Sequence, residues 1–416
     1  NMKTYGVIMA GGGGTRFWPL STKAEPKQFL NLSGKDILVN ETIDRQHDLM
    51  DQKDIFIVTN ETQAKMMKER TAGRIAADHI LAEPAARNTA ACIGYAAMEI
   101  LHKYGDGVMC IFAADAYIRD EAEYTRVMKE AVRAVEETDA LVTIGIHPTF
   151  PSTGYGYIRS VEEAGKVWRK VEEFVEKPDL ETAKSYLASG SYAWNSGMFI
   201  WKASTILHYF EELLPDVYAC LKQIGAALGT EKEQEVLHEV YPTIPKISVD
   251  YGIMERAKGV LMLEGDFGWN DVGSWDTLDA VRTRDAAGNI SSGDTLLLDA
   301  GEHRGILIRF VGKADALKQR HGLLVGLRLR FEAQLDGCEG DVLLDRHMRE
   351  EVEVLEHHAH LAAVEVQVDL LAVEGDILEV NGAGGRLLEE VQAAQQRRFA
   401  AAGGADDGHD LALFHA

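Results

Sequence analysis

Short apolar runs recur over residues 2–150 and are separated by longer amphipathic stretches. Four of the runs have the length of a strand: Tyr5–Ala10 (YGVIMA), Asp54–Thr59 (DIFIVT), Val108–Ala113 (VMCIFA) and Ala140–Ile146 (ALVTIGI). The stretch Glu121–Glu137 instead has apolar residues at helical spacing. Strands that alternate with helices are typical of a mostly parallel sheet flanked by helices. The pattern therefore predicts an α/β protein with a Rossmann-like sheet.

The composition of the chain changes near residue 300. After Thr295 there is no Ser, Thr, Pro, Tyr or Trp up to residue 416. These residue types supply turns and helix caps, so an ordinary domain of this length is not expected there. We predict one domain over residues 2–285 and a C-terminal region, 286–416, whose structure and origin the pattern does not define.

Charge and cysteine content limit the partners and the compartment. The chain has 66 acidic and 43 basic residues, a formal net charge of −23. This charge repels nucleic acid and anionic membrane, so we expect neither as a partner, and a bound phosphate must meet a local group of cations. The cysteines lie far apart, which favours free thiols in the cytoplasm over a zinc site; they are Cys92, Cys110, Cys220 and Cys338.

Targeting segments are not expected either. No stretch has the ~18 successive apolar residues of a membrane span. The residues after Met2, which we take as the natural start in place of Asn1, lack the apolar core of a signal peptide. We therefore expect a cytoplasmic protein.

The first predicted strand leads directly into a glycine-rich segment, MAGGGGTRFWPLSTKAEPKQF, at residues 9–29. In an open α/β sheet, ligands bind beyond the carboxyl ends of the strands. Gly11–Gly14 allow backbone N–H groups to approach an anion, and Arg16 and Lys27 add two cations. The spacing fits neither a P-loop nor a dinucleotide fingerprint. A triphosphate site is favoured over the alternative, a flexible turn, which would explain one or two of the glycines but not Arg16 and Lys27.

The same segment resembles the signature of the sugar-1-phosphate nucleotidyltransferases, and its FWPLS and KQF resemble the mannose-1-phosphate guanylyltransferase branch of that family. Six further segments match in order: EPAARNTAACIGYAA from Glu83, TGYGYI from Thr153, FVEKP from Phe174, WNSGMFIW from Trp194, ISVDYGIMERA from Ile247 and FGWNDVGSW from Phe267. The resemblance covers about residues 2–299. It implies the fold of the nucleotide-diphospho-sugar transferases.

The resemblance also implies a reaction and a nucleotide site. The reaction is transfer of GMP from GTP to mannose 1-phosphate, giving GDP-mannose and pyrophosphate by in-line attack on the α-phosphate. The GTP phosphates are expected at Gly11, Gly12, Gly13, Gly14 and Thr15, with Arg16 on the leaving pyrophosphate and Lys27 towards the α-phosphate. The base and ribose are expected at Glu83, Arg87, Asn88 and Thr89. Asn88 and Thr89 also fit the cap of an apolar helix that begins at Ala90.

Two aspartates are implied as ligands of Mg²⁺. They are Asp115 and Asp271, and Mg²⁺ prefers one or two carboxylates completed by phosphates and water. An aspartate after a strand is also common as an ordinary loop residue. The chain departs from the family here, because it has Phe112-Ala113-Ala114-Asp115-Ala116 where the family pattern is Leu-Pro-Ala-Asp-His, so the proline and the histidine are absent. A binding-only or catalytically impaired relative is therefore the alternative to an active enzyme.

The sugar phosphate is expected beside a Glu-Lys-Pro sequence. Glu176 offers a carboxylate to sugar hydroxyls and Lys177 an ammonium to the phosphate, although an exposed ion pair before a turn is the alternative. Pro178 predicts an extended backbone at Lys177. Further sugar contacts are implied at Tyr155, Gly156, Asn195 and Asp250, the last of which could instead support its loop. We expect packing roles for Trp194, Trp201, Trp269 and Trp275.

The C-terminal region departs further from the resemblance. Residues 288–300 (GNISSGDTLLLDA) resemble the start of a small β region in the family, but the apolar strands expected next are missing. His358, His360 and Glu365 form a partial cupin metal motif with flanking glycines at the wrong distances, so we assign no metal to it. A homodimer is one assembly open to the chain, and the sequence does not determine the oligomeric state.

Overall fold

A computed structural model describes residues 2–18 and 20–282 of the 416-residue chain. The chain divides into two units, Asn1–Ala286 and Ala287–Ala416, and the described residues lie in the first. The predicted boundary at residues 285 and 286 stays a prediction. The predictions for residues 286–416, including the β region, the partial cupin motif and Cys338, lie outside the described residues.

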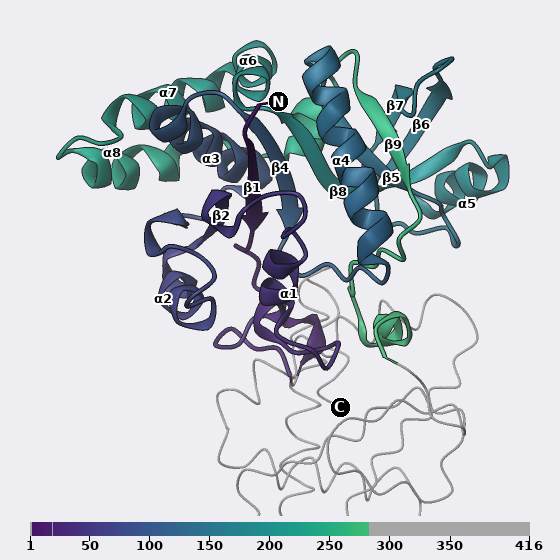
Figure 1. Ribbon diagram of the computed structural model, residues 1–416, viewed down its shortest axis with the longest axis horizontal. Coiled ribbons are helices and arrows are strands. Elements are labelled where there is room, and N and C mark those ends of the chain that lie inside the picture. The colour runs from purple at the N-terminus through teal and green to yellow at the C-terminus, as the bar shows by residue number, and fades with distance from the viewer. Residues whose placement is uncertain (1, 19, 283–416) are drawn as a thin grey trace, which may run out of the picture. The chain divides into compact units, whose positions relative to one another are not determined.

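A nine-stranded sheet forms the centre of the first unit, in the order β3-β2-β1-β4-β8-β5-β9-β7-β6 (Figure 1). Strands β7 and β8 run opposite to the other seven, so the sheet is mostly parallel, as predicted. The strands are β1 (Thr4–Met9), β2 (Ile55–Asn60), β3 (Ile80–Glu83), β4 (Val108–Ala113), β5 (Val142–Ile146), β6 (Tyr157–Glu162), β7 (Arg169–Val175), β8 (Tyr192–Lys202) and β9 (Leu261–Gly265).

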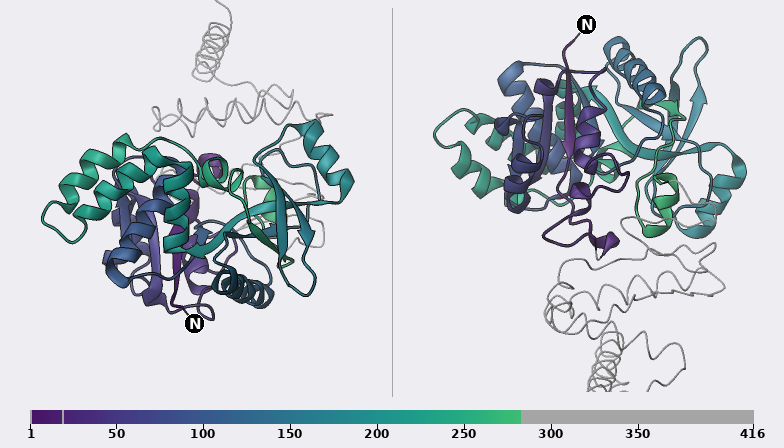
Figure 2. Two further views of the ribbon diagram at one scale, coloured as in Figure 1. Left: turned by 90° about the horizontal axis from the view of Figure 1, so that it is seen from above. Right: turned by 60° about the horizontal axis from the view of Figure 1, so that its bottom comes forward.

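Helices cover both faces of this sheet (Figure 2). Successive strand residues point to opposite faces, so Val7 and Met109 join one hydrophobic cluster while Ile8 and Cys110 join the other. This is why the strands read as continuous apolar runs. The first cluster includes α3 (Asn88–Tyr104), α6 (Ala203–Leu213), α7 (Pro215–Ala227) and α8 (Glu233–Val240). The second includes α1 (Leu38–Asp44), α2 (Glu61–Arg70), α4 (Glu121–Thr138) and α5 (Leu180–Ser189).

Local signals fix the ends of the long helix α4. The Asp120 carboxylate accepts a hydrogen bond from the backbone N–H of Glu123 at 3.0 Å and caps the first turn. The helix ends at Thr138, because the following residue, Asp139, has a φ of +59° and so leaves the helical region. Its buried face has the predicted helical spacing and consists of Tyr124, Val127, Met128, Ala131, Ala134 and Val135.

The carboxyl ends of four strands lead into the predicted nucleotide and metal residues. Strand β1 is followed by Gly11, β3 ends at Glu83, β4 is followed by Asp115, and β9 leads towards Asp271. This is the edge at which open α/β sheets bind ligands.

Two of the remaining expectations concern membranes and thiols. None of the helices formed by the described residues is long and apolar enough to cross a membrane. Cys92, Cys110 and Cys220 are free thiols, as the sequence predicts.

Candidate active site

The glycine loop after β1 is held by side-chain amides on one side. Gln28 donates from Nε2 to the carbonyls of Ala10 at 3.1 Å and Gly12 at 3.3 Å. Asn60 donates to the Gly11 carbonyl at 3.3 Å, and Gln63 to that of Gly12 at 3.4 Å. Within the described part of the chain, the N–H groups of residues 11–14 have no hydrogen-bond acceptor. The loop therefore presents unpaired donors, which suit an anion.

Gly14 brings the loop against Lys27. Its φ is +47°, and a Cβ at this position would lie 2.7 Å from the Cβ of Lys27 and 2.9 Å from its backbone nitrogen. Only glycine combines this conformation with this approach. By contrast, a Cβ at Gly12 or Gly13 would meet nothing within 4 Å, so these two positions are open to a ligand.

Lys27 contacts both predicted metal aspartates, Asp115 through its carboxylate and Asp271 through its backbone carbonyl. Its side chain is buried, and its ammonium lies 3.0 Å from Oδ2 of Asp115. The same ammonium donates a hydrogen bond to the backbone carbonyl of Asp271. The prediction placed Lys27 near a phosphate, and here it bridges the loops that the phosphate would meet.

The two aspartate loops are also tied by their backbones. Tyr117 and Asn270 form an antiparallel bridge, with N–O distances of 2.8 and 3.0 Å. Val272 follows Asp271 with a φ of +47°, which is unusual for a β-branched residue. Its N–H donates to Oδ1 of Asn270 at 2.7 Å, which holds this conformation. Strain of this kind is found where the surroundings fix a functional side chain.

The donor chemistry of Asp115 and Asp271 suits a hard divalent cation. Two carboxylates are a common protein contribution to a Mg²⁺ site, in which phosphates and water complete the coordination. No cluster of three or more His, Cys, Asp or Glu side chains over residues 2–18 and 20–282 could hold a metal by itself.

Glu83 lies beneath the glycine loop. It is buried, and its Oε2 lies 3.0 Å from where a Cβ would stand on Gly11. Burial raises the pKa of Glu83 to about 7, although a hydrogen bond from the hydroxyl of Tyr241 opposes the rise. Tyr241 belongs to none of the matched sequence segments, and no local pattern singles it out.

The rest of the predicted base pocket lies at the start of α3. The helix begins at Asn88, and its N-cap residue, Arg87, makes no side-chain cap. Thr89 accepts a hydrogen bond from the N–H of Val249 at 2.9 Å, so it ties this turn to the segment before Asp250. Nε of Arg87 is buried without a partner among the described residues, which leaves a donor for a ligand.

Three neighbouring strands bring the predicted sugar residues together. Asn195 on β8 donates its backbone N–H to the Gly156 carbonyl at 2.8 Å and its side-chain amide to Asp250 at 2.9 Å. A Cβ on Gly156 would collide with the carboxylate of Glu176. Asp250 itself opens a single π-helical turn, Asp250–Met254.

The carboxylates of this sugar region are poorly solvated. Burial, followed by the charge of Asp250, raises the pKa of Glu176 to about 7, and Oε2 of Glu176 is buried with no partner in the described part of the chain. Burial also raises the pKa of Asp250. An unsatisfied acceptor of this kind suits a ligand hydroxyl.

The predicted backbone at Lys177 is wrong. Its φ is +49°, in the left-handed region, and not extended. The preceding residue is fixed from outside, because the N–H of Glu176 donates to Glu255 at 2.8 Å and its carbonyl accepts from Tyr251 at 3.4 Å. These contacts override the local preference that Pro178 imposes. The ammonium of Lys177 lies 3.3 Å from Glu176 and is half-exposed.

Tyr155, which was predicted on the sugar face, also contacts a predicted metal residue. Its hydroxyl donates to Oδ1 of Asp271 at 2.6 Å. Burial, and then the charge of Asp271, raises the pKa of Tyr155 well above its usual value, so the hydroxyl keeps the proton that it donates. Trp194 and Trp201 are buried and Trp269 is half-buried, which agrees with packing roles.

Contacts thus join most of the predicted residues into one region. Arg16 is exposed and forms no ion pair with the described residues, although its charge acts on the Tyr155 hydroxyl. The side chain of Asn88 accepts a hydrogen bond from the N–H of its neighbour Thr89 at 2.8 Å. The roles of all these residues stay predictions.

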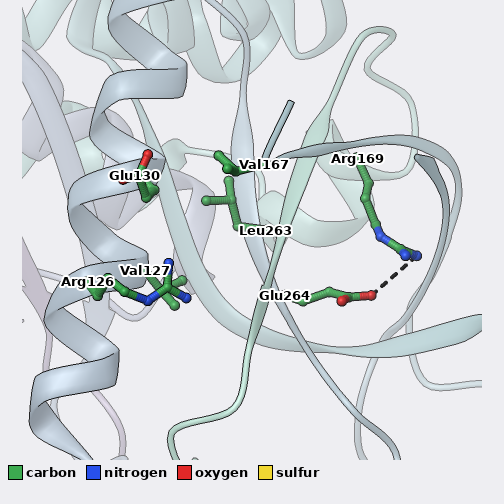
Figure 3. A pocket seen from close by; sticks show the side chains of 7 residues that line it. All are labelled: Arg126, Val127, Glu130, Val167, Arg169, Leu263 and Glu264. Atoms are coloured by element: carbon green, nitrogen blue, oxygen red, sulfur yellow. Dashed lines mark ion pairs between the residues drawn. The ribbon is translucent and has the colours of Figure 1, made fainter. Parts of the chain in front are cut away.

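A separate pocket of about 300 Å³ lies between α4, β7 and β9 (Figure 3). It contains none of the predicted site residues, and both of its arginines are already paired. Arg126 lies 2.7 Å from Glu123, and Arg169 lies 3.2 Å from Glu264. We assign the function to the strand ends because unpaired donors and buried carboxylates meet there.

Comparisons with known proteins agree with this geometry. The model of the nucleotidyl transferase family matches residues 5–287. The chain is 37% identical over 332 residues to the xanthan biosynthesis protein XanB of Xanthomonas campestris pv. campestris, covering 78% of this chain and 70% of that protein. It is 40% identical over 303 residues to a mannose-1-phosphate guanylyltransferase of Salmonella montevideo, covering 70% and 62%. The chain thus covers less than two thirds of the Salmonella protein.

A solved structure shows the same fold. A mannose-1-phosphate geranyltransferase of Thermus thermophilus matches with a TM-score of 0.64 and 34% identity, over 70% of this chain and 83% of that one.

The fold places the molecule among the α/β proteins with a mostly parallel sheet, and the candidate site lies at the strand ends. More particularly, the chain belongs to the nucleotidyl transferase family, because that family's model spans most of its length. This confirms the resemblance to the sugar-1-phosphate nucleotidyltransferases and the predicted fold class.

Proposed function

We propose that this protein transfers GMP from GTP to mannose 1-phosphate, using Mg²⁺, and releases pyrophosphate. A phosphate oxygen of the sugar phosphate forms a bond to the α-phosphorus of GTP, and the bond from that phosphorus to the β-phosphate oxygen breaks. The products are GDP-mannose and pyrophosphate. The guanylyltransferase relative of Salmonella supports this choice of substrates.

One observation carries the nucleotide half of the proposal. The glycine loop has its carbonyls held by Gln28, Asn60 and Gln63, while the N–H groups of residues 11–14 have no described acceptor. Backbone donors fixed in this way can bind phosphate without reorganising. Donors that are already in place stabilise the charge of the transition state, and this is usually the largest electrostatic contribution to catalysis.

Charge screening is the second task of the site. Two polyanions must meet in line, so positive charge has to lie at the α-phosphate and at the leaving group. Lys27 is fixed between the two aspartate loops, and Arg16 is exposed beside the glycine loop. We infer that Asp115 and Asp271 hold Mg²⁺, which when bound would neutralise phosphate charge.

The sugar half rests on the orphaned acceptor at Glu176. Its buried Oε2 can accept a sugar hydroxyl, while the half-exposed Lys177 can reach the phosphate. A carboxylate that can accept from hydroxyls and an ammonium that can bind a phosphate together suit a polyol that carries one phosphate.

A binding-only protein is the alternative function, since Ala113 and Ala116 stand where the family pattern around Asp115 has proline and histidine. The local backbone geometry supports activity. The N–H of Ala114 donates to Met9 at 3.0 Å, and its carbonyl accepts from Thr42 at 3.3 Å. The backbone beside Asp115 is therefore held without the proline and histidine of the family pattern.

Pyrophosphate release from GTP, mannose 1-phosphate and Mg²⁺ tests the proposal. We expect release that requires all three components and is fastest with GTP among GTP, ATP, UTP, dTTP and CTP. GTP binding without pyrophosphate would instead establish the binding-only alternative. The cytoplasmic location and the homodimer remain predictions from the sequence.

A further inference from the structure

Tyr155 lies where the sugar region and the metal region of the site meet. Its neighbour Gly156 is bonded to Asn195 and faces Glu176, so the backbone belongs to the sugar region. Its hydroxyl instead donates to Oδ1 of Asp271 at 2.6 Å. One residue therefore connects two groups of predicted function that lie 116 residues apart in the sequence.

The ring of Tyr155 is fixed by three other aromatic rings. The centroid distances are 5.1 Å to Trp194, 5.3 Å to Trp269 and 6.2 Å to Phe150. The two indoles meet it edge-on, at 74° and 70°, a favourable geometry for aromatic pairs. Because the ring cannot easily turn, the direction of the hydroxyl is also fixed.

The backbone and the carboxylate of Asp271 are held by different contacts. Its backbone is held by the bridge between Tyr117 and Asn270 and by the ammonium of Lys27. Its carboxylate, by contrast, receives a hydrogen bond from Tyr155 and from no other described residue. The rotation of the carboxylate about its own side chain is therefore set by Tyr155.

We propose that Tyr155 is a positioning residue that orients the Asp271 carboxylate for a divalent cation. The inference rests on the proposed function in one respect, the assignment of Asp271 as a metal ligand. Partners of this kind orient metal ligands in many sites, and losing one typically costs about 10- to 100-fold in metal affinity.

The test is the variant Tyr155→Phe, which keeps the ring and its packing and removes only the hydroxyl. Mn²⁺ replaces Mg²⁺ as the probe, and free Mn²⁺ is measured by electron paramagnetic resonance in the presence of protein and GTP. We expect Mn²⁺ to bind at least about tenfold more weakly. The KM for mannose 1-phosphate should change less than about twofold, because the sugar contacts remain.

Tyr157→Phe is the matched control. Tyr157 lies two positions along the same segment, is fully buried, and donates its hydroxyl to the Ser152 carbonyl at 2.9 Å. Removing the Tyr157 hydroxyl should leave the affinity for Mn²⁺ unchanged. In an Asp271→Asn background, Tyr155→Phe should have no further effect on Mn²⁺ binding, since the group that it orients is gone.

Two outcomes separate this inference from the proposed function. If Tyr155→Phe leaves the Mn²⁺ affinity unchanged and raises the KM for the sugar phosphate, the inference is overturned. Such a result would instead support the predicted contact of Tyr155 with the sugar. Wild-type protein that binds GTP and Mn²⁺ but releases no pyrophosphate would overturn the proposed function, while the Mn²⁺ titrations would still decide the role of Tyr155.

Discussion

At the scale of single residues, Glu83 gives the site a dependence on pH. Its pKa of about 7 means that the carboxylate ionises between pH 6 and pH 8. In the proposed site the ionised form would accept hydrogen bonds from the N–H groups of guanine, so the KM for GTP should fall as the pH rises. Between pH 6 and pH 8 the KM for GTP can fall by at most about tenfold, because the ionised fraction of Glu83 rises about tenfold over this range.

Steady-state KM values for GTP at saturating mannose 1-phosphate, measured from pH 6 to pH 8, check this expectation. Glu83→Gln is the control, because GTP titrates equally in both assays while the variant has no carboxyl at this position. A KM that falls equally in the two proteins would show that Glu83 does not contact the base.

Lys177 tests the sugar half of the site. Its ammonium is half-exposed beside Glu176, so Lys177→Ala removes a cation and leaves the core intact. The KM for mannose 1-phosphate should rise about tenfold, because a charge-assisted contact to phosphate is lost, while the KM for GTP should change less than about twofold.

A matched control for this variant is Lys170→Ala. Lys170 forms a similar ion pair, 3.3 Å from Glu163, on the neighbouring strand β7 and outside the predicted site. Lys170→Ala should change neither the KM for mannose 1-phosphate nor the KM for GTP. Equal effects of Lys177→Ala on both substrates would count against the assignment.

The sequence motifs predicted which residues form the candidate site. They did not predict the backbone conformation of these residues or their contacts. The sequence locates Glu83 and Lys177, but the partner Tyr241 is 158 residues from Glu83 and is placed there by helix packing. The positive φ of Lys177 depends on Glu255, another distant contact. Both depend on tertiary structure that no local pattern contains.

At the scale of elements, strands buried on both faces were the most predictable. Strand β4 has the predicted bounds, Val108–Ala113, because every position is apolar. Strand β3 was not predicted, since Ile80–Glu83 has only four residues. The antiparallel insertion of β8 between β4 and β5 was not predicted either, because it pairs strands that are distant in sequence.

The glycine loop yields a prediction at this scale. Gly14→Ala places a methyl group 2.7 Å from the Cβ of Lys27 at a positive φ, so the loop must move away from Lys27. We expect the KM for GTP to rise at least about tenfold and the free energy of unfolding to fall by about 1 kcal/mol.

Gly34→Ala separates these two effects. Gly34 has a φ of +91° with nothing within 4 Å of an added Cβ, so it carries the backbone strain without the contact. It should lose similar stability in urea unfolding while its KM for GTP stays unchanged. A Gly14→Ala protein with normal GTP kinetics would show that the contact with Lys27 does not shape the phosphate site.

At the scale of the whole molecule, the first unit contains all the residues of the proposed nucleotide site. Its two hydrophobic clusters cover both faces of the sheet, and every predicted site residue lies within Asn1–Ala286. A unit with its own core can fold by itself. We therefore expect a chain that ends at residue 300 to bind GTP within about threefold of the full-length affinity, as measured by calorimetry.

The same truncation separates binding from assembly. If the C-terminal region serves dimerisation or stability, the melting temperature or the oligomeric state of the shortened chain changes while its affinity for GTP does not. Arg16→Ala in the shortened chain is the control, since it should weaken GTP binding if the binding occurs at the glycine loop. A soluble, folded truncation that binds no GTP would mean that residues beyond 300 complete the nucleotide site, and the proposed division of the molecule would then be wrong.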